Sequence, residues 1–267
     1  MTTRHLPFVF ISCLHRRLSQ LASLSSFLLL RPGRLQARLA CSLWSLLFCL
    51  VLLTPTLPAY AVTQINLQGP PESGQFGTTV TALPNGNIVV TDPFFGKGAI
   101  EQTGAVYLYN GATGALISTL TGNAAGDQVG NGGVKVLKNG NYLVVSPYWH
   151  NSIGAVTWGN GATGVTGVVS SSNSLVGSTP GDHVGREDVI TLDNDNYLVV
   201  SQFWHNFTGA VTWGNGAIGA SGVVSSTNSL VGGTPGDGVG VVIVLSNDNY
   251  LTVSPHWQNN GAADVGQ

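Results

Sequence analysis

The feature that most constrains this chain is a ten-residue stretch that recurs after 55 positions. Gly154–Thr163 reads GAVTWGNGAT, and Gly209–Ile218 reads GAVTWGNGAI. A glycine-aspartate pair keeps the same interval, with its carboxylates at Asp127, Asp182 and Asp237. Such a period predicts one supersecondary unit per copy, and each copy buries its apolar face against its neighbours. The sequence therefore predicts a repeat fold before any single element is assigned.

Each copy predicts short strands separated by glycine-rich turns. In the second copy the expected strands are Val134–Leu137, Tyr142–Ser146, Gly154–Trp158 and Val165–Ser170, with a connection over 173–185. Asn139-Gly140 lies between the first two strands, and this pair readily takes the positive φ values of primed hairpin turns. Equivalent turns begin at Pro84, Asp193 and Ser246, so four hairpins are expected.

Four strands per copy predict an all-β fold in which each copy forms one blade of a β-propeller. The alternative is a β-solenoid, because the same pattern of strands and turns could form its coils. Paired Asn-Gly hairpins favour antiparallel blades over such coils. The approximate units are 62–126, 127–181, 182–236 and 237–267. Because the fourth unit is shortened, a partial propeller of about 3.5 blades is expected. Its exposed edges would then be able to pair with further repeats.

The first 61 residues have the composition of an export leader. All six of their charges are arginines, and an apolar run over 39–53 precedes Ala59-Tyr60-Ala61. This pattern predicts a helical secretory signal peptide that is cleaved near Ala61. A permanent anchor would need about 20 apolar residues, so the membrane is expected as a partner only if the leader stays uncleaved.

The residues after Ala61 are acidic and contain no cysteine. This part of the chain contains four Lys and Arg and twelve Asp and Glu, while Cys13, Cys41 and Cys49 all lie in the leader. Disulfides are thus excluded from the repeat region. Nucleic acid is excluded as a partner because contact with phosphates needs clustered Lys and Arg.

Two sets of residues resemble known exported repeats. Phe76-Gly77, Ile88–Pro93 and Gly104–Tyr109 resemble the FG-GAP blade of integrin-like propellers. Asn141–Pro147 and Asn173–Asp182 are similar to a bacterial repeat of unknown function that is found in long surface proteins, some of them adhesin-like. The resemblance implies a cell-surface propeller module and no particular activity.

Aromatic-imidazole pairs are the candidate ligand-binding residues. Trp149-His150 and Trp204-His205 lie 55 positions apart, and His256-Trp257 shows the inverted order. On equivalent loops these pairs would form an arc able to stack sugars or hold a cation. The alternative interpretation is that the tryptophans pack between blades. Trp158 and Trp213 are expected in the blade core.

The repeated aspartates are interpreted as structural. Each follows a glycine in a connection between blades, where a carboxylate accepts backbone N–H groups and holds a turn. Asp193 and Asp195 are the candidate calcium ligands, although two carboxylates fall short of the six to eight oxygens that calcium takes. A solvated turn is the alternative, and no cofactor is expected. His183, which occurs in one unit only, is interpreted as a surface substitution.

The sequence favours a non-catalytic module that is secreted or displayed at the cell surface. No Gly-x-Ser-x-Gly, His-Glu-x-x-His or phosphate-binding loop is present. The first hypothesis is therefore binding or adhesion through a glycan or protein ligand. The alternative is a structural spacer in a long surface protein, and the third is an enzyme acting on polysaccharide.

Overall fold

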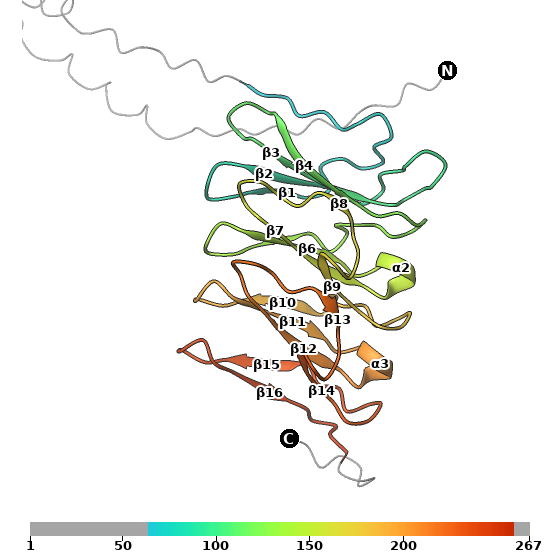
Figure 1. Cartoon of the computed structure of the whole chain (residues 1–267), viewed down its shortest axis with the longest axis vertical. Coiled ribbons are helices and arrows are strands. Elements are labelled where there is room, and N and C mark those ends of the chain that lie inside the picture. The colour runs from blue at the N-terminus through green and yellow to red at the C-terminus, as the bar shows by residue number, and fades with distance from the viewer. Residues whose placement is uncertain (1–63, 259–267) are drawn as a thin grey trace, which may run out of the picture. The chain divides into compact units, whose positions relative to one another are not determined.

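The computed structural model of the chain describes residues 64–258. The predicted signal peptide at 1–61, with its cleavage near Ala61, lies outside these described residues. Within 64–258 no helix has the length and apolar character to cross a bilayer. The described part is built from β-strands arranged in four sheets, which follow one another in chain order in Figure 1.

Each sheet begins with an antiparallel hairpin, as the sequence predicts. The hairpins join β1 (Val80–Ala82) to β2 (Ile88–Asp92), β5 (Val134–Val136) to β6 (Tyr142–Ser146), β10 (Asp188–Thr191) to β11 (Tyr197–Ser201), and β15 (Val241–Val244) to β16 (Tyr250–Val253). The turn differs from the expected one. Leu137 N donates to Asn141 O, which closes a three-residue loop in which only Gly140 has positive φ. This is a bulged hairpin and not a two-residue primed turn.

The third and fourth strands complete the first three sheets. The third strands are β3 (Ala105–Tyr109), β7 (Ala155–Gly159) and β12 (Ala210–Gly214), and the fourth strands are β4 (Leu116–Thr121), β9 (Ser174–Val176) and β14 (Ser229–Val231). All these neighbours pair antiparallel. In the described residues the fourth sheet consists of β15 and β16.

The prediction that Val165–Ser170 forms the fourth strand of its own sheet is wrong. Its central residues form β8 (Gly167–Val168), which pairs in parallel with β4 of the preceding sheet. The equivalent β13 (Gly222–Val223) pairs with β9 in the same way. The true fourth strand, β9, lies in the segment that was expected to be a connection. The second and third units therefore each contribute a fifth strand to the sheet before them.

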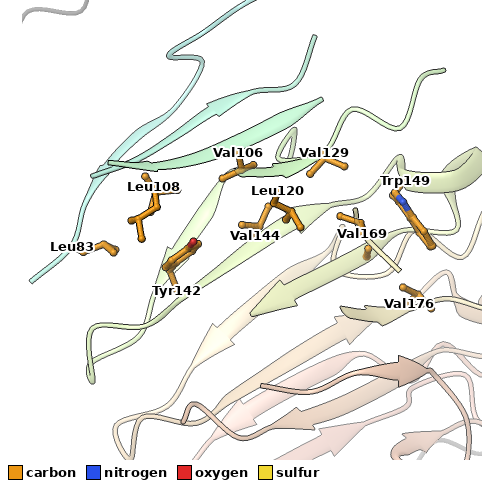
Figure 2. Packing of buried hydrophobic residues seen from close by; sticks show 12 residues of the cluster. Leu83, Val106, Leu108, Leu120, Val129, Tyr142, Val144, Trp149, Val169 and Val176 are labelled. Carbon is orange, nitrogen blue, oxygen red and sulfur yellow. The ribbon is translucent and has the colours of Figure 1, made fainter. Parts of the chain in front are cut away.

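Side chains from the two faces of each sheet form separate cores. In β6, Tyr142 and Val144 pack against the first sheet, and their neighbours Leu143 and Val145 pack against the third. In Figure 2, Leu108 of the first sheet lies over Tyr142. Strands buried on both faces read as continuous apolar runs, which is why YLVVS in β6 shows no polar alternation.

Tyr142 requires a glycine on the neighbouring strand. On the neighbouring strand β7 it pairs with Gly159, where an added Cβ would overlap the phenol ring. In the first sheet the large and small residues change places. Ile88 stands at the position of Tyr142, and its partner Tyr109 stands at the position of Gly159. Cross-strand neighbours thus keep a similar combined volume.

Side-chain amides also connect successive units. Nδ2 of Asn139 and of Asn141 both donate to the carbonyl oxygen of Gly216 in the next unit, at 2.9 and 3.0 Å. The equivalent hydrogen bonds one unit earlier run from Asn85 and Asn87 to Gly161 O. Exposed ion pairs add further links between units, from Lys135 to Asp188 and from Lys138 to Asp193.

The outer face of the first sheet is covered by residues that precede β1 in the chain. Phe76 packs its ring against Tyr107 and Tyr109, with centroids 5.7 and 6.2 Å apart. Leu67 packs against the same cluster. Repeat proteins need such a terminal cap, because an end unit otherwise leaves its apolar face in water.

Candidate functional site

The repeated aspartates lie at the boundaries between units, where each closes its own connection. Asp182 is buried, and its Oδ2 accepts hydrogen bonds from the backbone N and the Oγ of Ser178 and from the backbone N of Thr179. Oδ1 accepts a fourth bond from Thr179 Oγ1 at 2.7 Å. These contacts agree with the predicted turn-holding role.

Each of these carboxylates follows the fourth strand of one sheet and also binds the loop after the second strand of the next sheet. Oδ1 of Asp182 accepts the backbone N–H of His205 at 2.9 Å. Two equivalent contacts join Asp127 to His150 N and Asp237 to Gln258 N, at 2.9 and 3.1 Å. We call this arrangement the aspartate latch. It was not predicted, because no local pattern connects residues that lie 21 to 23 positions apart.

The latch affects the ionisation of the carboxylates. Burial alone would raise the pKa of Asp182, but the hydrogen bonds from His205, Ser178 and Thr179 outweigh burial and lower this pKa below its usual value. The pKa of Asp237 is lowered in the same way, with burial opposed by bonds from Thr234, Gln258 and Gly233. Both groups are therefore charged near neutral pH and act as acceptors, not as acids.

The residues that receive the latch form a left-handed turn. α2 (Trp149–Ser152) has positive φ at His150, Asn151 and Ser152, and α3 (Trp204–Phe207) has positive φ at the equivalent three residues. Left-handed geometry costs about 1–2 kcal/mol per non-glycine residue, so surrounding contacts must hold it. The latch supplies one such contact, because it fixes the N–H of the first left-handed residue.

The candidate Trp-His pairs are divided between interior and surface. Trp149 packs in the cluster between the first and second sheets, and Trp204 packs against the cluster between the second and third. Their histidines are exposed, with imidazole and indole centroids 5.3 Å apart in each pair. Both indole N–H groups are buried, and neither has a hydrogen-bond partner. The imidazoles are thus the more exposed rings of the two pairs.

The third candidate pair is not inverted. Tyr250 occupies the place of Tyr197 in its hairpin, and the same offset puts Trp257 in the place of Trp204. The latch confirms this register, because Gln258 donates to Asp237 as His205 donates to Asp182. His256 therefore corresponds to Phe203, and the expected Trp-His arc ends after two imidazoles.

A row of aromatic side chains crosses from the second unit to the third. His183 lies between Tyr148 and Phe203, with centroids 6.2 and 5.9 Å away and both rings edge-on. Phe203 contacts Phe207 at 4.8 Å, and the Arg186 guanidinium lies 5.2 Å from the Phe203 ring. We call these five residues the aromatic row. Phe207 is 53% exposed, so the row is open to solvent.

Sequence reasoning missed the row. His183 was interpreted as a surface substitution, yet its Nδ1 lies 3.2 Å from Pro147 O, and its ring joins the two units. The signal that would have found it is that residues 183, 186 and 207 all depart from the repeat. Next to the row, burial raises the pKa of Glu187, whose Oε2 accepts the N–H of Gln202.

The candidate calcium residues lie in the third hairpin turn. Asp193 is exposed, pairs with Lys138, and donates its backbone N–H to Asp248. Asp195 takes the left-handed position of the turn, at φ 70°. Over residues 64–258, no three His, Cys, Asp or Glu side chains gather closely enough to hold a metal.

The prediction that Trp213 lies in the core is wrong, because its side chain is exposed.

The fold is that of an all-β repeat protein in which the second and third units each add a strand to the sheet before them. The sequence profile described as a repeat of unknown function (DUF5650) matches residues 82–131, 136–186, 191–241 and 244–267. The chain therefore belongs to this repeat family. No curated protein is similar enough to extend that assignment.

Proposed function

We propose that this chain is a non-catalytic, exported repeat module that binds a glycan or protein ligand through the aromatic row. The observation that carries the proposal is the open succession of rings across two units, with a guanidinium against one of them. The predicted leader supports export to the cell surface or beyond. The repeated aspartates are not proposed as ligand-binding residues, because their carboxylates accept the hydrogen bonds of the latch.

The chemistry of the row favours a ligand with a flat apolar face and an anionic group. Aromatic rings offer large apolar surfaces with little conformational entropy to lose, and exposed clusters of them are typical of binding sites. Arg186 is one of only four basic residues after Ala61. An acidic sugar presents both a carbohydrate face for the rings and a carboxylate for this guanidinium.

The chain itself provides matched variants for the test. Phe207→Ser introduces the residue found at the same left-handed position in the second unit, where Ser152 has φ 63° against 62° for Phe207. His183→Gln introduces the counterpart residue Gln128. Leu116→Ser, in the first sheet, is the control because Leu116 is equally exposed. Glycan-array and cell-adhesion assays should show binding by the wild type and the control, with at least about tenfold loss in the two row variants.

The proposal fails if the folded wild type binds no glycan and adheres to no cell. It also fails if Phe207→Ser and His183→Gln bind as well as the control. Hydrolysis of an arrayed polysaccharide that is lost in His183→Gln would favour the enzyme hypothesis instead.

The spacer hypothesis is supported by a different observation, namely that the latch recurs with the same geometry at three boundaries. A spacer would retain full function with the row removed.

We also propose that the sheets curve about a common axis as propeller blades, in line with the FG-GAP resemblance. Small-angle scattering should then fit an arc, whereas a straight rod would favour the solenoid.

A further inference from the structure

The fourth strand is shorter in the second sheet than in the first. In the first sheet β4 is long enough for Ser118 to pair with Leu108 of β3, and Leu108 is fully buried. In the second sheet β9 begins at Ser174, so its pairing with β7 stops one residue before Trp158. Trp158 stands at the position of Leu108 but is only partly buried. The short strand therefore leaves an aromatic side chain beside open space.

A pocket of about 210 Å³ lies at this place, between segments of the second and third units. Trp158 lines it together with Ser172 and Asn173, which come just before β9. Residues 218–221, from the loop between β12 and β13, also line it. We call this site the tryptophan pocket. It is built from two successive units, so a single copy of the repeat would not form it.

The turn before β9 is held by the side chain of Asn173. Its Nδ2 donates to Val168 O at 2.9 Å, and its Oδ1 accepts the N–H of Ser170 at 2.9 Å. Ser172 Oγ is hydrogen-bonded to Ser170 Oγ at 2.8 Å. A hydroxyl group offers one donor and two acceptor sites, so this bond leaves Ser172 with hydrogen-bonding capacity for a ligand.

Trp158 and the loop after β12 hold each other in place. The indole N–H donates to Gly216 O at 3.0 Å. Gly219 lies so close that a Cβ at this position would overlap Cβ and Cγ of Trp158. Ala220 N donates to the Tyr197 hydroxyl at 2.8 Å, which fixes the same loop to the third sheet. The aromatic wall is thus preorganised, and a ligand would lose little affinity in ordering it.

The lining of the pocket combines apolar surface with hydroxyl groups. Trp158 and Ile218 supply the apolar surface, and Ser172 and Ser221 supply the hydroxyls. None of the lining residues in the described part of the chain carries a charge. A sugar ring matches this combination, because its C–H groups pack on an indole and its hydroxyls bond to serine. The volume is below the range of about 300–1,000 Å³ for pockets that hold larger ligands, so one ring fits.

We propose that the tryptophan pocket binds one uncharged sugar ring, which packs against Trp158. No residue of the aromatic row lines this pocket. The two sites also differ in charge, because Arg186 of the row favours an anionic ligand. The inference therefore goes beyond the proposed function and does not depend on it.

The test titrates the full chain with the methyl glycosides of glucose, galactose and mannose, followed by saturation-transfer difference NMR. At least one glycoside should bind saturably, with a dissociation constant of roughly 1–10 mM for so small a ligand. Trp158→Leu introduces the residue that the first sheet has at this position, and it should weaken binding at least about tenfold. Trp213→Leu makes the same exchange one unit later and should bind like the wild type.

A second pair of variants keeps the test decisive if Trp158→Leu does not fold. Ser172→Phe adds bulk at the pocket and leaves the indole in place, so it should also weaken binding at least about tenfold. Thr227→Phe is its matched control, because Thr227 is exposed at the same position in the third unit, where its Oγ1 bonds to Ser225 Oγ.

The proposal is overturned if none of the three glycosides binds up to about 100 mM. It is overturned equally if Ser172→Phe binds like the wild type, or if cyclohexanol binds as tightly as the best glycoside. Phe207→Ser, which shortens the aromatic row, should leave glycoside binding unchanged. A loss of binding in Phe207→Ser but not in Trp158→Leu would assign the sugars to the row and would also overturn the proposal.

Discussion

Replacement of Asp182 by asparagine tests the aspartate latch directly. Five N–H and O–H groups donate to this carboxylate at 2.7–2.9 Å. Asparagine keeps one acceptor oxygen and turns an NH₂ group toward the remaining donors, so about two or three bonds are lost. Buried bonds to a charged acceptor contribute about 1.5–3 kcal/mol each. Because Ser178, Thr179 and His205 are exposed and regain water, we take about 0.5–1 kcal/mol for each lost bond.

The expected loss in the free energy of unfolding is thus about 1–3 kcal/mol, and it should be local to the boundary between the second and third units. Urea unfolding followed by tryptophan fluorescence measures the loss, and hydrogen exchange at the His205 amide locates it. Asp193→Asn is the control, because Asp193 makes one exposed ion pair and should change stability by less than about 0.5 kcal/mol. If the two variants unfold at the same urea concentration, or if the His205 amide exchanges as in the wild type, the latch does not hold the units together.

Two further predictions follow from the same geometry. The folded-state pKa values of Asp182 and Asp237 lie below the ordinary value of about 3.9. The stability that these carboxylates contribute is therefore complete above that pH and is lost as the pH falls toward the folded-state values. The urea midpoint of unfolding should stay constant from pH 7 to 5 and decrease below about pH 4, and the decrease should be less steep in Asp182→Asn. Gly159→Tyr should destabilise the second sheet by about 1–3 kcal/mol through overlap with Tyr142, and adding Tyr142→Ile should recover most of the loss in thermal melts, because the first sheet pairs Tyr109 with Ile88.

The hairpins and the aspartates could be predicted because their signals are local. Asn139-Gly140 lies between two apolar runs, and Asp182 bonds within four residues of itself. The place of β8 could not be predicted in this way. Gly167 pairs with Leu120, 47 residues earlier, and nothing in the Gly-Val-Val letters distinguishes a neighbour in the same unit from one in the unit before. Strand partners at such separation are selected by packing and not by local preference.

The candidate site was predicted only in part for a related reason. Period counting found the Trp-His pairs but misplaced His256, because the two-residue shortening of the last unit, which Tyr250 already shows in the sequence, was not applied to this pair. The aromatic row brings Tyr148, His183 and Phe207 together across a boundary between units. Their contacts depend on how two left-handed turns are held, and that geometry is not visible in a single copy of the repeat.

The strand exchange gives the repeat a direction. Because β8 and β13 complete the sheets that precede them, each of these sheets depends on the unit that follows it in the chain. The Asn139 and Asn141 amides and the Asp182 latch also point from one unit to the next. A cap is therefore needed at the first sheet and a completing segment at the last, and these are different requirements. The first is met by Phe76 and Leu67, which cover the outer face of the first sheet.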